Sequence, residues 1–407
     1  MPAVTVHHST PITRTFRVEQ VAGIFDLPLA DATSTQFTVH VPPLTGPGSD
    51  WSIGAIIGPS GSGKSSVARQ WLGDHAAGGC FVKAFDWPDD RSILDGFPPE
   101  LASKDFTAAL TAVGFSSPPV WVQPYHTLSD GQKFRADLAR ALLLDTPHSC
   151  VGMDEFGGTV TEQVAQFAAA AIAKGIRRGA FPNQKFIAVG ARSEFAQWIE
   201  PDWVLDMSQR RLARGWVQPP PAPGSDTSPD QLLPGETPAT DDWCQKHFRG
   251  RPPIDIEVVH GTRDHWPRFE PHHYLSANLH RAARVYLATW RAEPIAFCAT
   301  LPQPGKFTGY RRCHRLVVLP DYQGMGIGLK LLDAVAALEL DPPPEASPAP
   351  RCRRFSITTS HPALMRALHR RPTWTMTTLD RGNLAKLRSA FHASAATRTT
   401  ASFAYAA

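Results

Sequence analysis

A glycine-rich stretch with a lysine and serines near residue 60 has the composition of a phosphate-binding loop. It reads Gly58-Pro-Ser-Gly-Ser-Gly-Lys-Ser65. Glycines let successive backbone N–H groups point at phosphate oxygens, with the positive end of a helix dipole behind them. Lys64 is expected to reach the β- and γ-phosphates of ATP, and the Ser65 hydroxyl to ligate Mg²⁺. The predicted nucleotide contacts are Gly58, Ser60, Gly61, Gly63, Lys64, Ser65 and Ser66.

The residues on either side of this loop predict the elements that hold it. An apolar run over residues 51–57 precedes it, and a helical pattern over residues 66–72 follows it. A buried strand, a glycine-rich loop and a helix N-terminus are the context that a P-loop requires. The alternative, a Gly/Ser turn that matches by chance, does not account for both flanking elements.

An acidic pair follows a second short apolar run. Asp154 and Glu155 come directly after residues 150–153, Cys-Val-Gly-Met, which read as a buried strand. Asp154 is expected to hold Mg²⁺ through water, and Glu155 to polarise the water that attacks ATP. The order of the two motifs predicts ATP hydrolysis as well as ATP binding.

A third motif, Leu128-Ser-Asp-Gly-Gln-Lys-Phe-Arg135, lies between the first two. It resembles the signature motif of ATP-binding-cassette (ABC) ATPases, with Asp130 where a second glycine is usual. The resemblance implies that Ser129, Gly131 and Gln132 contact the ATP of a second copy, in a head-to-tail homodimer with ATP between the subunits. The alternative is an ordinary helix capped by Ser129.

Two features of that family are missing. Ala191 and Arg192 follow the strand predicted over residues 186–190, where the family has a switch histidine, and no convincing Q-loop glutamine precedes the signature. The departures predict slow or partner-dependent hydrolysis.

A second glycine-rich loop lies near residue 325. Gln323-Gly-Met-Gly-Ile-Gly328 follows the strand-like run 315–319 and precedes an amphipathic helical pattern. This resembles the acyl-CoA loop of GNAT N-acetyltransferases, in which backbone N–H groups and a helix N-terminus face a pyrophosphate. The alternative is a turn without a ligand. The resemblance implies acetyl-CoA, or a related acyl-CoA, on Val317, Val318, Gln323, Gly324, Gly326 and Gly328.

The acid and base of an acyl transfer are harder to place. The candidates are His272, His273, Tyr274 and His361. A histidine can act as a base near neutral pH, and Tyr274 could protonate a leaving thiolate. For each of them a surface or capping role is the alternative, and the His-His-Tyr group could also supply metal ligands. His314 is expected to be structural.

The charge is unevenly distributed along the 407 residues. Residues 244–407 hold 23 Lys and Arg against 11 Asp and Glu, a net +12, whereas residues 1–243 hold 18 against 26, a net −8. A basic domain favours a polyanionic partner, nucleic acid and DNA first. The alternative is a basic surface that faces the acidic neighbour or a CoA phosphate.

Cysteines and hydropathy indicate the compartment. The six cysteines form no CxxC pair, and no signal pattern or membrane-length apolar run is present. We therefore expect a soluble, cytoplasmic protein without membrane contact.

Strand and helix patterns give the fold class. We expect an α/β protein, with an ABC-type P-loop ATPase domain followed by a GNAT-like mixed α/β domain. Strand-like alternation over residues 13–18 and 36–41 predicts an antiparallel platform before the P-loop. The predicted ranges are 1–216 for the ATPase domain, 217–240 for a Pro-rich linker, 241–393 for the GNAT-like domain and 394–407 for a flexible tail.

The domain order resembles proteins in which an ABC-type ATPase is fused to an acetyltransferase domain related to Mom-type phage proteins, which modify adenine in DNA. That resemblance favours an ATPase that positions DNA while the second domain modifies a base. Two alternatives stay open: an acetyl-CoA-dependent N-acetyltransferase of protein or RNA, and a non-catalytic, ATP-dependent nucleic-acid switch.

Overall fold

The computed structural model describes residues 2–183, 185–191, 194–214, 251–273, 278–303, 309–341, 352–380 and 399–406. The chain forms two compact units, each built from two segments. The first is Met1–Asp86 with Arg140–Arg251, and the second is Trp87–Ala139 with Pro252–Ala407. These units divide the chain differently from the predicted ranges, because Trp87–Ala139 packs with the C-terminal segment. The predicted linker lies outside the described residues.

A six-stranded sheet is the centre of the first unit, in the order β4-β5-β6-β3-β7-β8. Neighbouring strands are parallel except β8, which is antiparallel to β7. Every residue of β3 is buried, as expected of a central parallel strand covered on both faces. The strands are β3 (Ile53–Ile57), β4 (Phe81–Val82), β5 (Cys150–Met153), β6 (Lys185–Gly190), β7 (Trp203–Asp206) and β8 (Arg211–Arg214), and the helices are α2 (Lys64–Leu72), α6 (Glu162–Arg177) and α7 (Glu194–Ile199).

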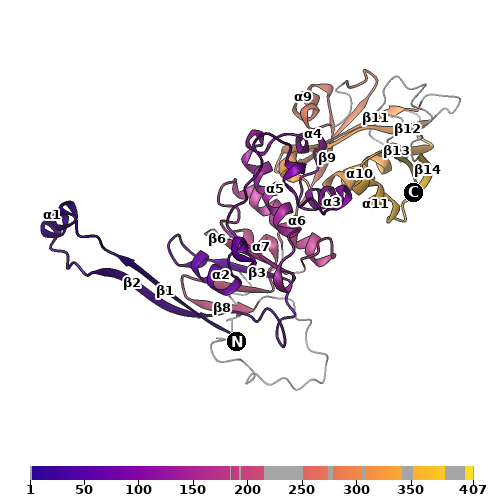
Figure 1. Ribbon diagram of the computed structural model, residues 1–407. Coiled ribbons are helices and arrows are strands. Elements are labelled where there is room, and N and C mark those ends of the chain that lie inside the picture. The colour runs from indigo at the N-terminus through magenta and orange to yellow at the C-terminus, as the bar shows by residue number, and fades with distance from the viewer. Residues whose placement is uncertain are drawn as a thin grey trace. The chain divides into compact units, whose positions relative to one another are not determined.

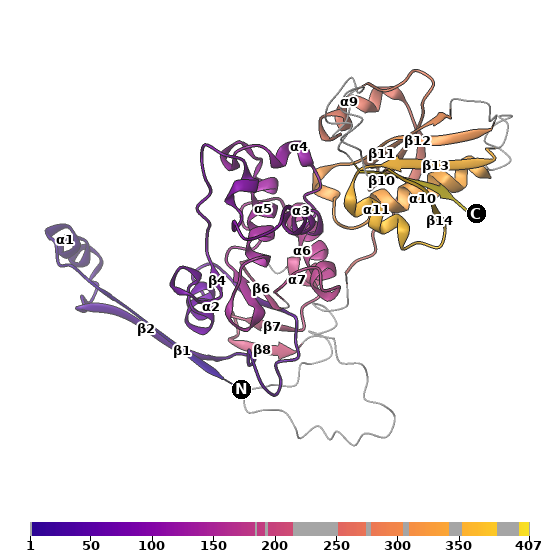
Figure 2. The same ribbon diagram turned by 45° about the vertical axis from the view of Figure 1, so that its right-hand side comes forward.

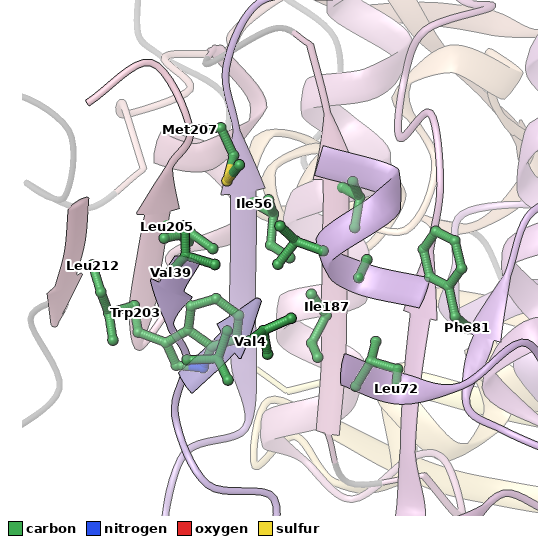
Figure 3. Packing of buried hydrophobic residues seen from close by; sticks show 14 of the residues in the cluster. Val4, Val39, Ile56, Leu72, Phe81, Ile187, Trp203, Leu205, Met207 and Leu212 are labelled. Atoms are coloured by element: carbon green, nitrogen blue, oxygen red, sulfur yellow. The ribbon is translucent and has the colours of Figure 1, made fainter. Parts of the chain in front are cut away.

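Figure 3 shows the apolar cluster under the P-loop helix α2. Trp203 packs edge-on against two other tryptophans, with ring centroids 5.3 Å from Trp51 and 5.6 Å from Trp71. The indole of Trp203 lies so close to β3 that a Cβ on Gly54 would be 2.0 Å from it. Glycine is therefore required at residue 54, and the packing fixes the strand that leads into the P-loop.

The N-terminal strands form a separate two-stranded sheet. β1 (Ala3–Pro11) pairs antiparallel with β2 (Ala32–His40), and Figure 1 shows α1 (Phe16–Phe25) at the far end of this ribbon. The prediction of a strand over residues 13–18 is wrong. The side chain of Thr15 accepts a hydrogen bond from the Val18 N–H and begins helix α1 there, which overrides the short polar/apolar alternation.

The second unit contains a seven-stranded sheet in the order β14-β15-β13-β12-β11-β10-β9 (Figure 2). All neighbours are antiparallel except β12 and β13. The strands are β9 (Glu257–Gly261), β10 (Arg284–Trp290), β11 (Glu293–Pro302), β12 (Tyr310–Val318), β13 (Arg354–Thr359), β14 (Trp374–Asp380) and β15 (Thr400–Tyr405).

Helices cover both faces of this sheet. On one face, Phe297 of β11 contacts Trp266 and Phe269 of the short helix α9 (Trp266–Phe269). On the other face, the hydroxyl of Thr300 donates to the buried carboxylate of Glu339 in α10 (Ile327–Leu340). α11 is Pro362–His369, and the first segment of the unit supplies α3 (Ser103–Ala112), α4 (Pro118–Trp121) and most of α5 (Asp130–Leu142).

The prediction of a flexible tail over residues 394–407 is wrong for its last part. Strand β15 lies between β13 and β14, with Ile357 opposite Phe403 and Trp374 opposite Tyr405. The sequence there is rich in Ala, Ser and Thr and has little apolar character of its own. Two neighbouring strands supply the hydrogen bonds that make it a strand. None of the described helices is long and apolar enough to cross a membrane.

Truncation of the Phe403 side chain should measure how much β15 contributes to the stability of the second unit. Its side chain is 1% exposed, so Phe403→Ala is expected to lower the free energy of unfolding of this unit by about 3–5 kcal/mol. Denaturant unfolding followed by tryptophan fluorescence measures the change. Phe403→Leu is the control and should lose much less. Equal stability of Phe403→Ala and the parent protein would contradict this placement of β15.

Candidate functional sites

The P-loop connects β3 to α2 through three glycines with positive φ. Gly58, Gly61 and Gly63 have φ values of 144°, 77° and 92°, and Gly63 is the N-cap residue of α2. The Lys64 ammonium donates to the Pro59 carbonyl at 2.8 Å and so lies across the loop. Burial lowers the pKa of Lys64, an effect that the Asp154 carboxylate opposes. This arrangement fits a triphosphate, which would take the place of the carbonyl as partner of the ammonium.

The predicted magnesium ligands are in contact. The Ser65 hydroxyl donates to the Asp154 carboxylate at 2.8 Å, and the Glu155 N–H donates to the same oxygen at 3.0 Å. Asp154 is 5% exposed. A hydroxyl and a carboxylate oxygen side by side are hard ligands of the kind that Mg²⁺ binds together with nucleotide phosphates.

Glu155 has an unusual backbone. Its φ is 49°, in the left-handed region, and its side chain is exposed. The next N–H, that of Phe156, donates to the Val189 carbonyl of β6 at 2.7 Å and so fixes the turn. A non-glycine residue in this region costs about 1–3 kcal/mol and is common at functional sites. The turn places Glu155 directly after β5, next to Asp154, which is a predicted magnesium ligand.

Glu155→Gln should separate ATP binding from hydrolysis. The amide keeps the size of the side chain but cannot accept a proton from water, so the hydrolysis rate is expected to fall by about 100-fold or more while ATP still binds. Phosphate release measures the rate, and size-exclusion chromatography with saturating ATP and Mg²⁺ should show a trapped dimer. A protein that hydrolyses ATP at the parent rate would contradict the role of Glu155.

One aromatic residue beside the P-loop is not evident from the motifs. Phe37 of β2 lies against Gly63, where an added Cβ would be 2.5 Å from its ring, and the Arg210 guanidinium lies 4.7 Å from the ring centroid on one face. Only its place in the alternating run 36–41 marks it in the sequence. A larger residue at 63 would require the Phe37 ring to shift and would have to adopt a φ of 92°, which L residues rarely adopt.

The signature residues form a helix cap, which is the alternative role that the sequence left open; contact with the ATP of a second copy stays a prediction. The Ser129 hydroxyl accepts from the Gln132 N–H at 3.4 Å, and the Gln132 side-chain oxygen accepts from the Ser129 N–H at 3.0 Å. This reciprocal pair is a capping box that begins α5. Ser129 is exposed, so its capping role leaves the helix N-terminus accessible to a ligand from outside the subunit.

The second glycine-rich loop connects β12 to α10. Gly324 and Gly326 have φ values of 86° and 88°, and Gly326 is the N-cap residue of α10. A Cβ on Gly328 would be 3.0 Å from a methyl group of Val318, so helix and strand approach closely. The first turn of α10 carries no acidic residue. The backbone N–H groups in the first turn of a helix have no partner within that helix, so they can bind the pyrophosphate of an acyl-CoA.

β12 and β13 separate next to that loop. Their parallel pairing covers only Tyr310–Arg312 with Arg354–Ser356, although β12 continues to Val318 and β13 to Thr359. Among the described residues, no strand pairs with β12 on that side beyond Arg312. An open strand edge beside a helix N-terminus can bind an extended chain with amide groups, such as the pantetheine arm of CoA.

Comparisons with known proteins agree with this geometry for the C-terminal segment. Residues 281–361 match a family model described as an acetyltransferase (GNAT) domain. They are a GNAT acetyltransferase domain. No curated protein sequence matches the chain.

Solved structures with some similarity include two acetyltransferases and one ABC protein. IAA acetyltransferase from Bacillus cereus has 15% identity and a TM-score of 0.28, over 37% of this chain and 99% of that one. A GNAT acetyltransferase from Elizabethkingia anophelis with acetyl-CoA bound has 16% identity and a TM-score of 0.27, over 37% and 98%. The cbiO1 protein of Clostridium perfringens, part of an ABC transporter complex, has 17% identity and a TM-score of 0.30, over 40% and 75%.

One of the candidate histidines, His273, lies near His280 and His314. His273 and His280 both lie near enough to His314 of β12 to lower its pKa, and the His280 N–H donates to the His314 ring at 3.4 Å. Burial is the main cause of the lowered pKa of His314. Together with the charges of the neighbouring Arg315 and Arg312, it lowers that pKa to about 4. His314 is therefore neutral at neutral pH. The expectation that His314 is structural stays a prediction; the structure places it on β12, where its ring accepts the His280 N–H.

The other candidates lie elsewhere. His272 is close to Asp321, and its pKa is lowered by burial, which the Asp321 carboxylate opposes. His361 is the N-cap residue of α11 after β13, and its pKa is lowered by burial and by Arg366. Tyr274 lies outside the described residues. Within the described ranges, no group of three or more His, Cys, Asp or Glu side chains is arranged to hold a metal ion.

Proposed function

We propose that the protein is an ATP-binding and ATP-hydrolysing ABC-type ATPase joined to an acyl-CoA-dependent GNAT transferase that modifies a DNA base. The observation that carries the proposal is the presence of two separate glycine-rich loops, each at the N-terminus of a helix. One has the hydrogen-bonded Ser65 and Asp154 beside it, and the other lies beside an open strand edge of the GNAT domain.

ATP is expected to hold two copies of the chain together. Gly58–Ser65 binds the phosphates in one subunit, and the exposed Ser129 at the start of α5 can contact the γ-phosphate bound to the other. Lys64 would neutralise charge on the phosphates, Ser65 and Asp154 would hold a Mg²⁺ ion that does the same, and Glu155 would orient the attacking water. Without a switch histidine, the dimer serves as a clamp more than as a fast hydrolase.

Acyl transfer requires an amine and a base. The acceptor nitrogen attacks the thioester carbonyl carbon, the C–S bond breaks, and the departing CoA thiolate takes up a proton. The proton of the attacking nitrogen goes to a base beside the open edge of β12. His273 and His361 are our candidates for that base, with the neutral His314 next to the first of them.

The charge distribution favours a nucleic-acid acceptor. Residues 244–407 carry a net charge of +12, and strand β12 contributes the exposed Arg312 next to the GNAT site. The resemblance of the domain order to Mom-type fusion proteins, which is an expectation from the sequence alone, favours DNA and adenine as the first choice. A base inside a duplex must be flipped out before its amino group can be acylated, and a clamp on DNA would hold such a deformed duplex.

A nucleoside digest tests the acceptor. DNA from cells that express the protein is digested and analysed by mass spectrometry for an acylated nucleoside, with Gly326→Glu as the matched control. In parallel, the purified protein is incubated with labelled acetyl-CoA and separate DNA, RNA and protein fractions. Label in DNA supports the proposal. Label in protein or RNA alone identifies the N-acetyltransferase alternative, and no acetyl-CoA binding together with ATP-dependent DNA retention identifies the non-catalytic switch.

A further inference from the structure

A buried arginine connects the signature helix to the acyl-CoA loop. Arg135 of α5 is 1% exposed, and its guanidinium lies 3.7 Å from the carboxylate of Asp321, in the turn between β12 and the loop. Two of its nitrogens, Nε and Nη2, are buried without a hydrogen-bond partner among the described residues. Burial lowers the pKa of Arg135 to about 10, an effect that Asp321 opposes. A buried cation with one carboxylate partner depends on that partner.

A second contact joins the same parts of this unit. The Gln323 side chain, at the start of the loop, accepts from the Ser116 N–H at 2.6 Å and donates to the Val318 carbonyl at 2.9 Å. Gly114 has a φ of 88°, and an added Cβ would be 2.8 Å from the Gln323 carbonyl oxygen. The side chain of Gln323 therefore binds protein groups on two sides, and its backbone is held against the segment between α3 and α4.

We propose that Arg135, Ser116 and Gly114 position the acyl-CoA loop, so that ATP at the signature motif and acyl-CoA at residues 323–328 alter each other's affinity. The inference rests on the proposed function, since it requires both ligands. It adds a positioning role for a segment that the sequence assigns to the ATPase.

Helix α5 connects the signature motif directly to the contact with Asp321. Ser129 is the first capping residue of α5, and Arg135 lies six residues further on, about 9 Å along the axis. A rigid helix that moves when its N-terminus meets a phosphate moves Arg135 as well. Because separation of Arg135 from Asp321 would leave a buried charge unpaired, the turn at Asp321 follows the helix. By linkage, acyl-CoA must change ATP affinity by the same factor as ATP changes acyl-CoA affinity.

The test compares acetyl-CoA affinity with and without ATP. Glu155→Gln protein, in which hydrolysis is suppressed, is titrated with acetyl-CoA by calorimetry in the absence and presence of saturating ATP and Mg²⁺. We expect the dissociation constant to change at least about 5-fold. In the double variant with Asp321→Asn, the change should fall below about 2-fold. Asp321→Asn also removes a negative charge near the CoA phosphates, but that effect is present in both titrations and cancels in their ratio.

Two matched controls separate positioning from general damage. Asp255→Asn removes an exposed carboxylate from the same unit. It should leave unchanged the ratio of the acetyl-CoA dissociation constants measured without and with ATP. Gly114→Ala should reduce the ratio because its Cβ pushes on Gln323. Gly78→Ala carries the same kind of backbone strain, with a φ of 84°, but has nothing within 4 Å of the added Cβ and should not reduce it.

Three outcomes overturn the inference. The first is that acetyl-CoA and ATP both bind with no effect on each other, and the second is that Asp321→Asn keeps the full effect. Either result leaves the proposed function standing. Failure of Glu155→Gln protein to bind acetyl-CoA under any condition instead removes the proposed transferase function and the inference with it.

Discussion

Lys64→Ala is expected to weaken ATP binding by about 10- to 100-fold, since charged hydrogen bonds of this kind contribute about 1.5–3 kcal/mol. Lys64 is the residue of the P-loop whose charge faces the phosphates, and its ammonium already lies across the loop at the Pro59 carbonyl. The backbone N–H groups of the loop remain in the variant. Binding should therefore be weakened strongly while the fold is kept.

Fluorescent ATP titration measures the loss, and Lys83→Ala is the control. Lys83 is an exposed lysine of the same unit, so its removal changes the net charge equally without touching the loop. The ATP affinity of the Lys83→Ala protein should stay within about 2-fold of that of the parent protein. If Lys64→Ala binds ATP as tightly as Lys83→Ala, the P-loop assignment is wrong.

Gly326→Glu is expected to reduce acetyl-CoA affinity by about 100-fold or more. The substitution puts a carboxylate at the N-cap of α10, where the pyrophosphate is expected, and like charges in a partly buried site repel strongly. It also places a side chain on a residue with a φ of 88°. Both effects act on the acyl-CoA loop and neither acts on the P-loop, so ATP affinity should be unchanged.

Gly179→Glu is the matched control for this variant. Gly179 has a φ of 64° and nothing within 4 Å of an added Cβ, so the control carries backbone strain and the same charge in the other unit. Calorimetry with acetyl-CoA should show parent-like binding for Gly179→Glu. Tight acetyl-CoA binding by Gly326→Glu would reject the placement of the acyl-CoA loop.

Much of the fold could be predicted because its strands are marked locally. The runs 150–153 and 186–190 correspond to β5 and, to within one residue, to β6, since a short apolar run follows polar residues in both cases. Residues 400–405 could not be found in this way. Their strand depends on hydrogen bonds to β13 and β14, which are distant in the sequence.

The candidate sites also divide into features marked by a local sequence motif and features that depend on contacts between distant residues. The P-loop, the acidic pair and the acyl-CoA loop are each contiguous in the sequence, so their residues could be predicted from the sequence alone. The contact of Phe37 with Gly63, the grouping of His314 with His273 and His280, and the ion pair of Arg135 with Asp321 each join distant parts of the chain. No short sequence pattern predicts such contacts.

Strand β15 has a consequence for biosynthesis. It is inserted between two strands that leave the ribosome earlier, so β13 and β14 have no partner on these edges until residues 400–405 have been translated. At about 5–20 residues per second, the nascent sheet waits for seconds with a gap beside β13. Edge strands in this state are prone to pair wrongly, and a stop codon before residue 400 would make the gap permanent.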